Sequence, residues 1–593
     1  MGTSDPLQVE GSVQGKDPAQ MKGSRRAWGG AILLFLFAAG LRARGIEHGM
    51  PHNYVPDTHI VRAALGMAKD KNPVPPVGKY STYPNLLPYC LLPLYGAHFV
   101  QGKFAGDWSG AQEYGDHILE HPSEVHRIAR WLVLLFGALT PIAVLLAARS
   151  AGLERGAWFA AWFAASGLMH VHFSVQERPW VPMMFFAALS AWPAALYVRK
   201  PALRTLVLAG LCAALSAACH QSGFFVLAIP GLAWLVSPLG WNREGLLARL
   251  KHGVLCVGAF FVLAILVGYP SYLIYGAPTA DQTIGGDTAD ISFNGQSLNL
   301  DRNLGTFPSL AKAFFGYGPV LTLFLLAGFG TLLKRRAALP AVLFCGGWAL
   351  FFMTSANEHT RYLLPVAVLG CLPAGMLVER LWSRGPGVRV ALCLFALFPA
   401  AQSWRLGSVL AQPDTRESGE RWLQELDGSA MVLIDRYGPI VDLDQSSLEL
   451  LMNIREASGS SLGSREARRL SALNEGELTG GVRAIYASDL MKIEELDGTI
   501  ALRKGLHAAY GETPAAALAA LGVTHLLLVN RLQEGLEGNL LRGLLKDQTA
   551  LVTAGKADSS RAEFRLPMEL KFPLTSLWSI ERPGPWMGLY DLR

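Results

Sequence analysis

Charged residues are scarce in this chain. Only 17% of its 593 residues are Asp, Glu, Lys or Arg, whereas 51% are hydrophobic, and the mean hydropathy is +0.27. This composition excludes a soluble enzyme and indicates a polytopic membrane protein. The net charge of +6 is modest, and Lys and Arg gather in short loops between apolar stretches. The basic residues therefore report membrane topology, and nucleic-acid binding is not expected.

Several signatures of other protein classes are also missing. The seven cysteines have no CxxC or Cys/His ligand spacing and lie within or beside apolar stretches, so neither a disulfide framework nor a structural zinc site is expected. The chain has no GxGxxG or P-loop signature and no evident internal repeat. We therefore expect no nucleotide-binding fold and no cofactor.

Apolar stretches long enough to cross a bilayer, roughly 17 to 25 residues, recur along the chain. The stretch 83–100 is apolar too, but Pro84, Pro88 and Pro93 lack backbone donors, so we expect it not to cross. We predict about eleven spans, near residues 28–45, 127–148, 156–174, 180–198, 203–219, 222–240, 252–274, 319–334, 339–355, 362–381 and 387–404.

The basic loops between these stretches predict the orientation, because short cytoplasmic loops are rich in Lys and Arg. Residues 1–27 are expected to form a disordered cytoplasmic N-terminus, followed by a transmembrane module over 28–405. Within this module, the external loops are predicted at 45–126, with short helices at the membrane surface, and at 275–318. The protein is then expected to cross a bacterial inner membrane many times.

The pattern changes after residue 405. Short apolar runs at 431–435, 524–530 and 586–593 are typical of buried strands, and a helical Ala-rich segment occupies 513–522. We therefore predict an extracytoplasmic α/β domain over 406–593, which is large enough to have its own core.

Three polar clusters occur at ends of predicted spans that the charge pattern places on the external side. The first contains Asp57, just after the first span and at the head of a helical pattern. A carboxylate there can act as a general base if it reaches within roughly 3 Å of a hydroxyl. Alternatively, Asp57 caps the helix that begins at Thr58, and the two roles are compatible.

The second and third clusters contain Glu177 with Arg178, and Arg361 with Tyr362. An idle ion pair in an exposed loop is the alternative for Glu177 and Arg178. Arg361 begins a helix at the external headgroup level, where a guanidinium can contact phosphate. His220 forms a polar break at the same depth, which an ordinary helix turn would also explain.

Cations gather on this face as well. Arg42 and Arg44 end the first span, and Arg62 and Lys79 follow in the first loop. A guanidinium group can donate two parallel hydrogen bonds to a phosphate, so these cations fit an anionic substrate. Alternatively, their side chains extend toward the lipid headgroups. His48, His52 and His59 lack acidic co-ligands, so we predict no metal site there.

These motifs resemble those of the GT-C glycosyltransferases, in particular the glycosyltransferase 39 group with its ArnT-like and protein O-mannosyltransferase-like members. The resemblance covers residues 28–405 as an arrangement of spans. It rests on Pro56-Asp57-Thr58, on Gln176 to Trp180 (QERPW) and on Arg361 to Pro365 (RYLLP). The chain has Thr58 where the family usually has a second acid, and His220 where many relatives have Lys.

The resemblance implies transfer of a sugar from a polyprenyl-phosphate donor to a lipid, glycan or protein acceptor at the external membrane face, with inversion at the anomeric carbon. Asp57 would take the acceptor proton, while Arg361 and His220, helped by loop cations, would stabilise the leaving phosphate. Glu177 and Arg178 would orient the substrates.

Two other functions fit a polytopic chain. A transporter also carries ionisable residues in its membrane region, but here they cluster at one face and no inverted repeat is evident. A non-catalytic carbohydrate-binding membrane protein is the second alternative, and in that case an Asp57→Asn change would be silent.

Overall fold

The structure is a computed structural model, and it describes most of the chain. The described residues are 18–52, 54, 58–276, 291–293, 296–298, 302–331, 335–355, 359–493, 500–502, 513–529, 541, 545, 548–555, 570 and 572–593. The predictions that concern Asp57, residues 1–17 and much of the loop 275–318 lie outside these residues.

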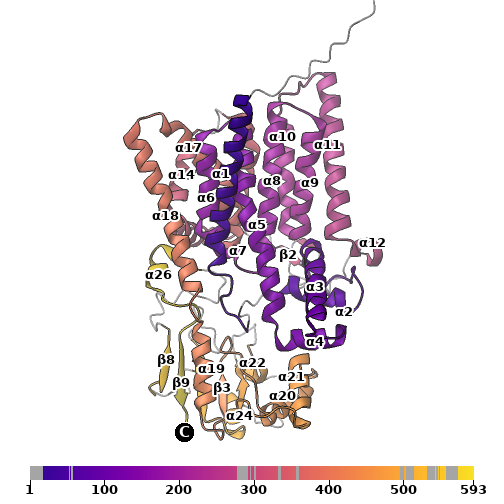
Figure 1. Cartoon of the computed structure of the whole chain (residues 1–593), viewed down its shortest axis with the longest axis vertical. Helices are drawn as coiled ribbons and strands as arrows, with labels where there is room; N and C mark the ends of the chain where they lie inside the picture. The colour runs from indigo at the N-terminus through magenta and orange to yellow at the C-terminus, as the bar shows by residue number, and fades with distance from the viewer. Residues whose placement is uncertain are drawn as a thin grey trace, which may run out of the picture.

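The first two-thirds of the chain forms a bundle of helices, at one end of which the C-terminal region lies (Figure 1). The bundle helices are α1 (Pro18–Ala43), α5 (Ser123–Ser150), α6 (Arg155–Ser166), α7 (Leu168–Ser174), α8 (Trp180–Arg199), α9 (Leu203–Cys219), η1 (Gln221–Leu227), α10 (Ala228–Val236), α11 (Arg243–Leu263), η2 (Ala264–Gly268), α14 (Pro319–Phe329), η6 (Arg336–Ala338), α15 (Leu339–Met353), η7 (Thr360–Leu363), α16 (Leu364–Leu369), α17 (Cys371–Trp382) and α18 (Pro386–Leu410).

The lengths of these helices agree with a membrane protein. Among the described residues, six helices are long and apolar enough to cross a bilayer, and a seventh is added if α13 (Thr306–Tyr317) and α14, bent by 112°, form one span. Three further apolar helices, Trp28–Ala43, Leu203–Cys219 and Gln221–Val236, are shorter. The chain is therefore a polytopic helical membrane protein, while the count of eleven spans stays a prediction. The helix α1 begins at Pro18, ahead of the first predicted span, and its apolar part is Trp28–Ala43.

Small residues allow the bundle helices to approach closely. A Cβ added to Gly156 of α6 would lie 2.1 Å from the carbonyl oxygen of Gly375 in α17. Any larger side chain at this crossing would force the two backbones apart. Close approach at small residues is a main source of helix association in a membrane, where burial of apolar surface contributes little.

The third predicted span is interrupted between two helices, and an arginine donates hydrogen bonds to the backbone carbonyls at the interruption. α6 ends at Ser166 and α7 starts at Leu168, so the carbonyls of Ala164 and Ala165 have no helical partners. The buried Arg42 donates from Nη1 to the Ala165 oxygen at 2.9 Å, and its Nη2 lies 2.8 Å from His170 Nδ1. Arg42 is therefore part of the packing of the bundle, which differs from its predicted role as a phosphate-binding cation.

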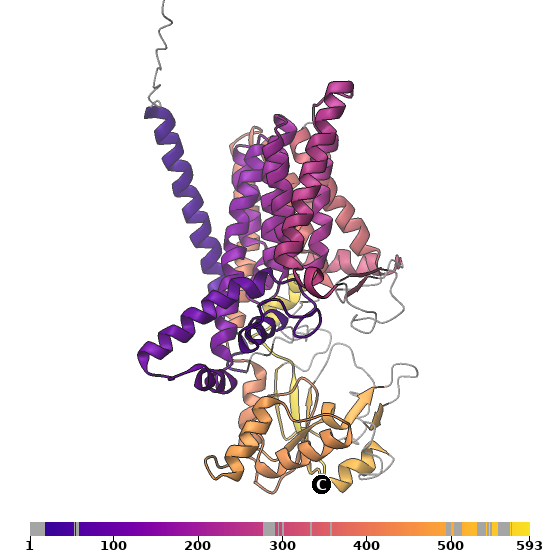
Figure 2. The same cartoon turned by 90° about the vertical axis from the view of Figure 1, so that its right-hand side faces the viewer.

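Short helices and the C-terminal region share one end of the bundle, which we call the sheet-side end (Figures 1 and 2). The first loop contains the helices α2 (His59–Lys69), α3 (Leu86–Ala105) and α4 (Ala111–Glu120), and helices were predicted in this loop. The helix α12 (Ser271–Tyr275) precedes the second predicted loop, whose described part contains the hairpin of β1 (Ile291–Phe293) and β2 (Gln296–Leu298), and α13.

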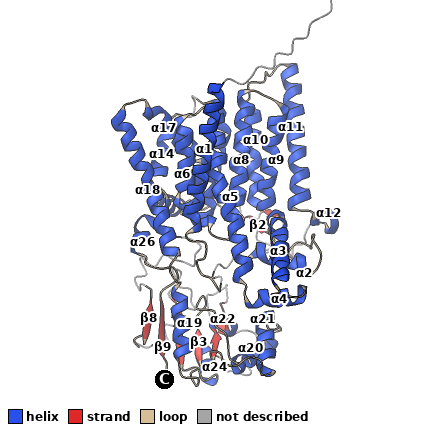
Figure 3. Ribbon diagram, viewed as in Figure 1, coloured by secondary structure: helices blue, strands red, loops and turns tan. Residues whose placement is uncertain are grey.

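The C-terminal region has a five-stranded sheet, order β4-β3-β7-β9-β8, in which β3, β4 and β7 are parallel (Figure 3). The predicted strands are confirmed as β3 (Val432–Ile434), β7 (His525–Val529) and β9 (Met587–Asp591), and the predicted helix as α24 (Pro514–Ala520). The other elements are α19 (Thr415–Glu425), α20 (Gln445–Ala457), α21 (Ser464–Asn474), β4 (Ala484–Tyr486), α22 (Ala487–Leu490), β5 (Met491–Ile493), β6 (Ile500–Leu502), β8 (Val552–Ala554) and α26 (Pro573–Ser579).

Buried contacts join the C-terminal region to the first loop. The guanidinium carbon of Arg416 in α19 lies 3.7 Å from the centre of the Tyr54 ring, and two 2.8 Å hydrogen bonds to Asp414 hold the guanidinium in place. Glu420, one turn further along α19, pairs with His52 at 3.1 Å. The segment that precedes Asp57 in the sequence is therefore fixed against α19.

Candidate functional site

Glu177 lies in the turn between α7 and α8 and is completely buried. Arg130 of α5 donates from Nε to Glu177 Oε2 at 2.8 Å, and His126 Nδ1 lies 3.1 Å from Oε1. Arg130 Nη1 also donates to the carbonyl oxygens of Ile46 and His48, both at 2.7 Å. This network ties the second polar cluster to the start of the first loop, and Arg178 is buried in the same turn.

The surroundings of Glu177 keep it ionised. Burial by itself would raise the pKa of its carboxyl, but the Arg130 guanidinium and the His126 ring outweigh burial and hold that pKa well below its ordinary value. The stabilisation from the ionised carboxylate is thus present above the ordinary Glu pKa and is lost only as the pH falls through the lowered one. Glu177 is an anchoring residue in this geometry, and the idle exposed ion pair considered for it does not describe its position.

Removal of one member of this pair should destabilise the protein strongly. We expect Arg130→Met or Glu177→Leu to cost about 3–5 kcal/mol, because the remaining charge stays buried and loses its partner in the fully buried ion pair. Thermal unfolding of the detergent-solubilised chain measures this effect. Arg127→Gln is the matched control, since Arg127 pairs with Glu47 at 2.8 Å on the surface, where such pairs contribute under about 1 kcal/mol. Equal shifts in the melting temperature of both variants would contradict the interpretation.

His220 lies between α9 and η1 with an extended backbone, φ −153° and ψ 144°. Its Nδ1 accepts a hydrogen bond from the Ser222 amide at 3.1 Å, so Nε2 carries the proton in the neutral ring. The ring centre lies 4.1 Å from that of Trp180, at the start of α8. The polar break is therefore a folded turn whose histidine packs against the end of the QERPW motif.

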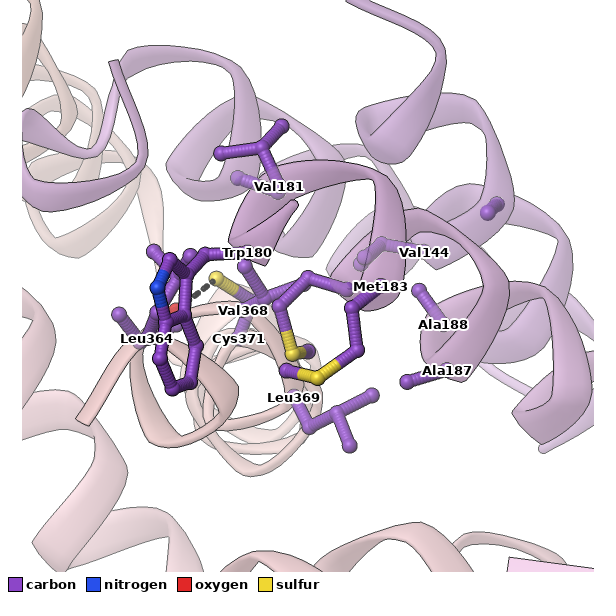
Figure 4. Packing of buried hydrophobic residues seen from close by; sticks show 14 of the residues in the cluster. Val144, Trp180, Val181, Met183, Ala187, Ala188, Leu364, Val368, Leu369 and Cys371 are labelled. Carbon is purple, nitrogen blue, oxygen red and sulfur yellow. Dashed lines mark hydrogen bonds between the residues drawn. The ribbon is translucent and has the colours of Figure 1, made fainter. Parts of the chain in front are cut away.

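Arg361 and Tyr362 lie in η7, directly before α16. The Tyr362 ring meets Trp180 edge to face, with centres 5.1 Å apart, and stacks on Phe352 at 4.8 Å. The guanidinium carbon of Arg361 lies 6.0 Å from the centre of the Trp180 ring. Trp180 itself is buried in the cluster that also contains Leu364 of α16 (Figure 4). Trp180 is thus the common neighbour of His220, Arg361 and Tyr362.

The first loop reaches the same cluster through aromatic rings. Tyr83 lies 5.3 Å from the His220 ring and 5.5 Å from the His59 ring, measured between centres. Arg62 Nη2 lies 3.2 Å from His59 Nδ1, and Arg62 Nε donates to the carbonyl oxygen of Tyr80 at 3.1 Å. Asp57 is outside the described residues, but His59, two positions later in the sequence, belongs to this chain of contacts.

Lys79 is placed differently from the other candidates. Its ammonium pairs with Asp70 at 2.5 Å, and half of its side chain is exposed. The Tyr80 hydroxyl donates to the same carboxylate. The structure brings His220, Arg361 and Tyr362 together around Trp180, with Glu177 and Arg178 in the turn before it. Arg62 reaches this cluster only through His59 and Tyr83, and Lys79 lies in a surface ion pair.

The pKa of His220 gives a pH-dependent test. Burial, with a contribution from the Arg361 charge, lowers the pKa of the ring from 6.5 to about 3. His220 therefore stays neutral in the fold, whereas the unfolded chain takes up a proton below pH 6.5. Its contribution to stability is present above pH 6.5 and is lost as the pH falls toward 3.

We expect His220→Gln, which cannot titrate, to flatten this acid dependence. Between pH 6.5 and 3 the free energy of unfolding of the native protein should fall relative to the variant by about 1.4 kcal/mol per pH unit. Melting temperatures of both proteins over this range measure the difference. Parallel curves would show that His220 is protonated in the fold.

Sequence reasoning missed three residues of this arrangement. Arg130 occurs in the middle of a helical pattern, where it reads as a snorkelling cation, and Tyr83 begins an apolar stretch. Trp180 ends the QERPW motif, and the motif alone assigns it no role. Its position after Pro179 could have identified it, because a residue at the start of a helix that follows such a polar turn lies at the same depth as the turn.

Metal ligands were also considered for the first loop. Within the part of the chain that the structure describes, no group of three or more His, Cys, Asp or Glu side chains could hold a metal ion. The three loop histidines have other neighbours, since His48 Nδ1 lies 2.7 Å from the Gly45 oxygen, His52 pairs with Glu420, and His59 contacts Arg62.

No protein-family model matches the sequence, and no protein of curated function matches it either. Among solved structures, the Archaeoglobus fulgidus oligosaccharyltransferase with a tethered acceptor peptide aligns over 84% of this chain and 68% of its own, at 11% identity and a TM-score of 0.42. ArnT from Cupriavidus metallidurans, bound to undecaprenyl phosphate, aligns over 68% of this chain and 82% of its own, at 15% identity and a TM-score of 0.41.

A third similar structure is the S. cerevisiae protein O-mannosyltransferase Pmt1-Pmt2 complex bound to the sugar donor. It aligns over 44% of this chain and 37% of its own, at 16% identity and a TM-score of 0.31. All three proteins are GT-C glycosyltransferases, the class whose motifs the sequence resembles. At these identities and TM-scores the similarity assigns this chain neither a fold nor a residue role.

Proposed function

We propose that this chain is a membrane glycosyltransferase that moves a sugar from a polyprenyl-phosphate donor to an acceptor at the external membrane face. One observation carries the proposal. His220, Arg361 and Tyr362 come from distant parts of the sequence and meet at Trp180, at the sheet-side end of the bundle. A cation and a neutral ring N–H donor beside a large apolar surface suit a phosphate group that carries a lipid chain.

In this mechanism Arg361 and His220 stabilise the phosphate as it leaves. Negative charge grows on the phosphate oxygens when the bond to the anomeric carbon breaks, and a fixed guanidinium lowers the energy of that state. His220 donates from Nε2 and stays neutral, because burial and, to a smaller extent, the Arg361 charge lower the pKa of its ring. Arg62, in contact with the cluster through His59, adds a second cation, while Lys79 acts from the periphery.

Asp57 is the proposed general base. The acceptor oxygen attacks the anomeric carbon from the face opposite the phosphate, Asp57 accepts the acceptor proton, and the configuration inverts. The pairing of His52 and Tyr54 with α19 supports this role, because it restricts the segment that leads to Asp57. Preorganisation of a base reduces the entropy that the reaction must otherwise lose.

Glu177 and Arg178 support the site through the turn in which they lie. The Glu177–Arg130 pair holds this turn against the first loop, so Trp180 is fixed relative to both.

The proposed membrane topology puts this site on the external side. Eleven spans with the basic loops in the cytoplasm place the clusters, the first loop and the C-terminal domain outside a bacterial inner membrane.

A transfer assay tests the function. The purified chain, reconstituted in liposomes, is supplied with a panel of polyprenyl-phosphate sugars and with envelope lipids, glycans and proteins as acceptors. We expect release of polyprenyl phosphate and an acceptor-linked sugar of inverted configuration from at least one donor. Uptake of solute by the same liposomes without any sugar transfer would favour a transporter and overturn the proposal.

A further inference from the structure

The C-terminal region contains a cavity of about 350 Å³, away from the cluster around Trp180. It lies between α19 and α21, beside the starts of β3 and β4. Its volume is in the range of pockets that bind small molecules, roughly 300 to 1,000 Å³. The cavity adjoins the first loop, because Glu420 on its wall is the residue that pairs with His52.

The polar walls of this cavity are held in place. Arg469 donates from Nε to the Leu443 oxygen at 2.9 Å and from Nη2 to the Gly480 oxygen at 3.2 Å. Asp442 receives Arg465 at 3.1 Å and Arg469 at 3.5 Å. The side chains of Arg469 and Asp442 are therefore ordered before any ligand arrives, which lowers the entropy lost on binding.

One cation on the wall differs from the others. The Arg483 side chain is exposed and lines the cavity, and no described residue pairs with its guanidinium. The floor is aliphatic, with Leu423 and Val432 both buried. A ligand for this cavity thus needs hydrogen-bond acceptors for Arg483 and an apolar face for the floor. It also needs polar groups that can bond to the carboxylates of the wall and to the amide of Gln424.

A saccharide ring has this combination of groups. Its hydroxyls both donate and accept, and its C–H face packs on aliphatic carbon. A polyanion fits poorly, because Glu420, Asp427 and Asp442 face Arg469 and Arg483, so the cavity carries one more negative than positive charge. We infer that this cavity binds a saccharide unit of the acceptor and positions the acceptor beside the first loop. The inference rests on the proposed function.

Direct binding tests this inference without relying on transfer. Saturation-transfer NMR on the full chain in nanodiscs is run with glucose, galactose, mannose, N-acetylglucosamine and their disaccharides, and with inorganic phosphate for comparison. We expect at least one saccharide to bind. Arg483→Gln should weaken that binding about 10-fold, the effect of losing one charge-assisted hydrogen bond.

A second variant blocks the cavity. A Cβ on Gly428, which lines the cavity, meets no atom within 4 Å, so Gly428→Trp can project into the space without disturbing the backbone. It should abolish saccharide binding. Arg421→Gln is the matched control, since Arg421 is an exposed arginine of α19 outside the cavity lining, and it should bind like the native chain.

The outcomes separate the two proposals. If no saccharide binds, if both cavity variants bind normally, or if phosphate binds through Arg483 instead, the inference is overturned. In each case a chain that still binds undecaprenyl phosphate and transfers sugar leaves the proposed function intact. A chain whose saccharide binding is weakened by Arg483→Gln and abolished by Gly428→Trp, but which transfers no sugar, would support the saccharide site and contradict the proposed function.

Discussion

Sugar transfer should fall by roughly 10²–10⁴-fold when Asp57 is replaced by asparagine, which is the usual contribution of a positioned general base. The amide keeps the size of the carboxylate and can still cap a helix, but it cannot accept the acceptor proton. The loss should appear mainly in kcat, with the KM for the donor little changed, because donor contacts come from other residues. Initial rates with a labelled polyprenyl-phosphate sugar measure both constants.

The control for this variant is Asp107→Asn, which changes an exposed carboxylate in the same loop and should leave the rate unchanged. If Asp57→Asn transfers sugar at the native rate, Asp57 is only a helix cap, and the base must be sought elsewhere. A native rate with a lower melting temperature would point to capping directly, since loss of a good cap costs about 1 kcal/mol.

Replacement of Arg361 by alanine should have the second largest effect, a decrease in kcat of about 10²–10³-fold. The guanidinium is proposed to stabilise charge that develops on the leaving phosphate, so donor binding should weaken less than the rate falls. Arg361→Lys keeps the charge but loses paired hydrogen bonds, and we expect it to recover only part of the activity. Transfer rates and donor affinity, measured on the same preparations, separate the two effects.

The matched control is Arg380→Ala, an exposed arginine in the last turn of α17 at the far end of the same continuous apolar segment. It should transfer sugar normally. Equal activity of Arg361→Ala and Arg380→Ala would remove Arg361 from the mechanism. Melting temperatures of both variants show whether a lower rate reflects a loss of structure.

The sequence predicted the helices and strands well where apolar periodicity is strong. The strands at β3, β7 and β9 are short apolar runs with clear boundaries, and most bundle helices begin within a few residues of the predicted spans. The order β4-β3-β7-β9-β8 could not be predicted, because strand pairing depends on contacts between residues far apart in the sequence.

The candidate site shows the same division. Polar residues at the ends of apolar segments can be placed at one depth by counting spans, and His220, Arg361 and Tyr362 do meet. What counting cannot give is lateral position. Arg130 and Glu177 are 47 residues apart, and only the packing of α5 against α8 brings them together. Likewise, Arg42 reaches the carbonyl of Ala165 only because α1 packs against α6.

The position of Arg42 has a consequence for biogenesis. While the chain is being synthesised, α1 enters the bilayer with a guanidinium whose only carbonyl partner is Ala38 of its own helix. The oxygens of Ala164 and Ala165 become available only after more than a hundred further residues have left the ribosome. Until then, exposure of this charge to hydrocarbon disfavours release of α1 into lipid. The first helix should therefore remain beside the insertion machinery until α6 has been synthesised.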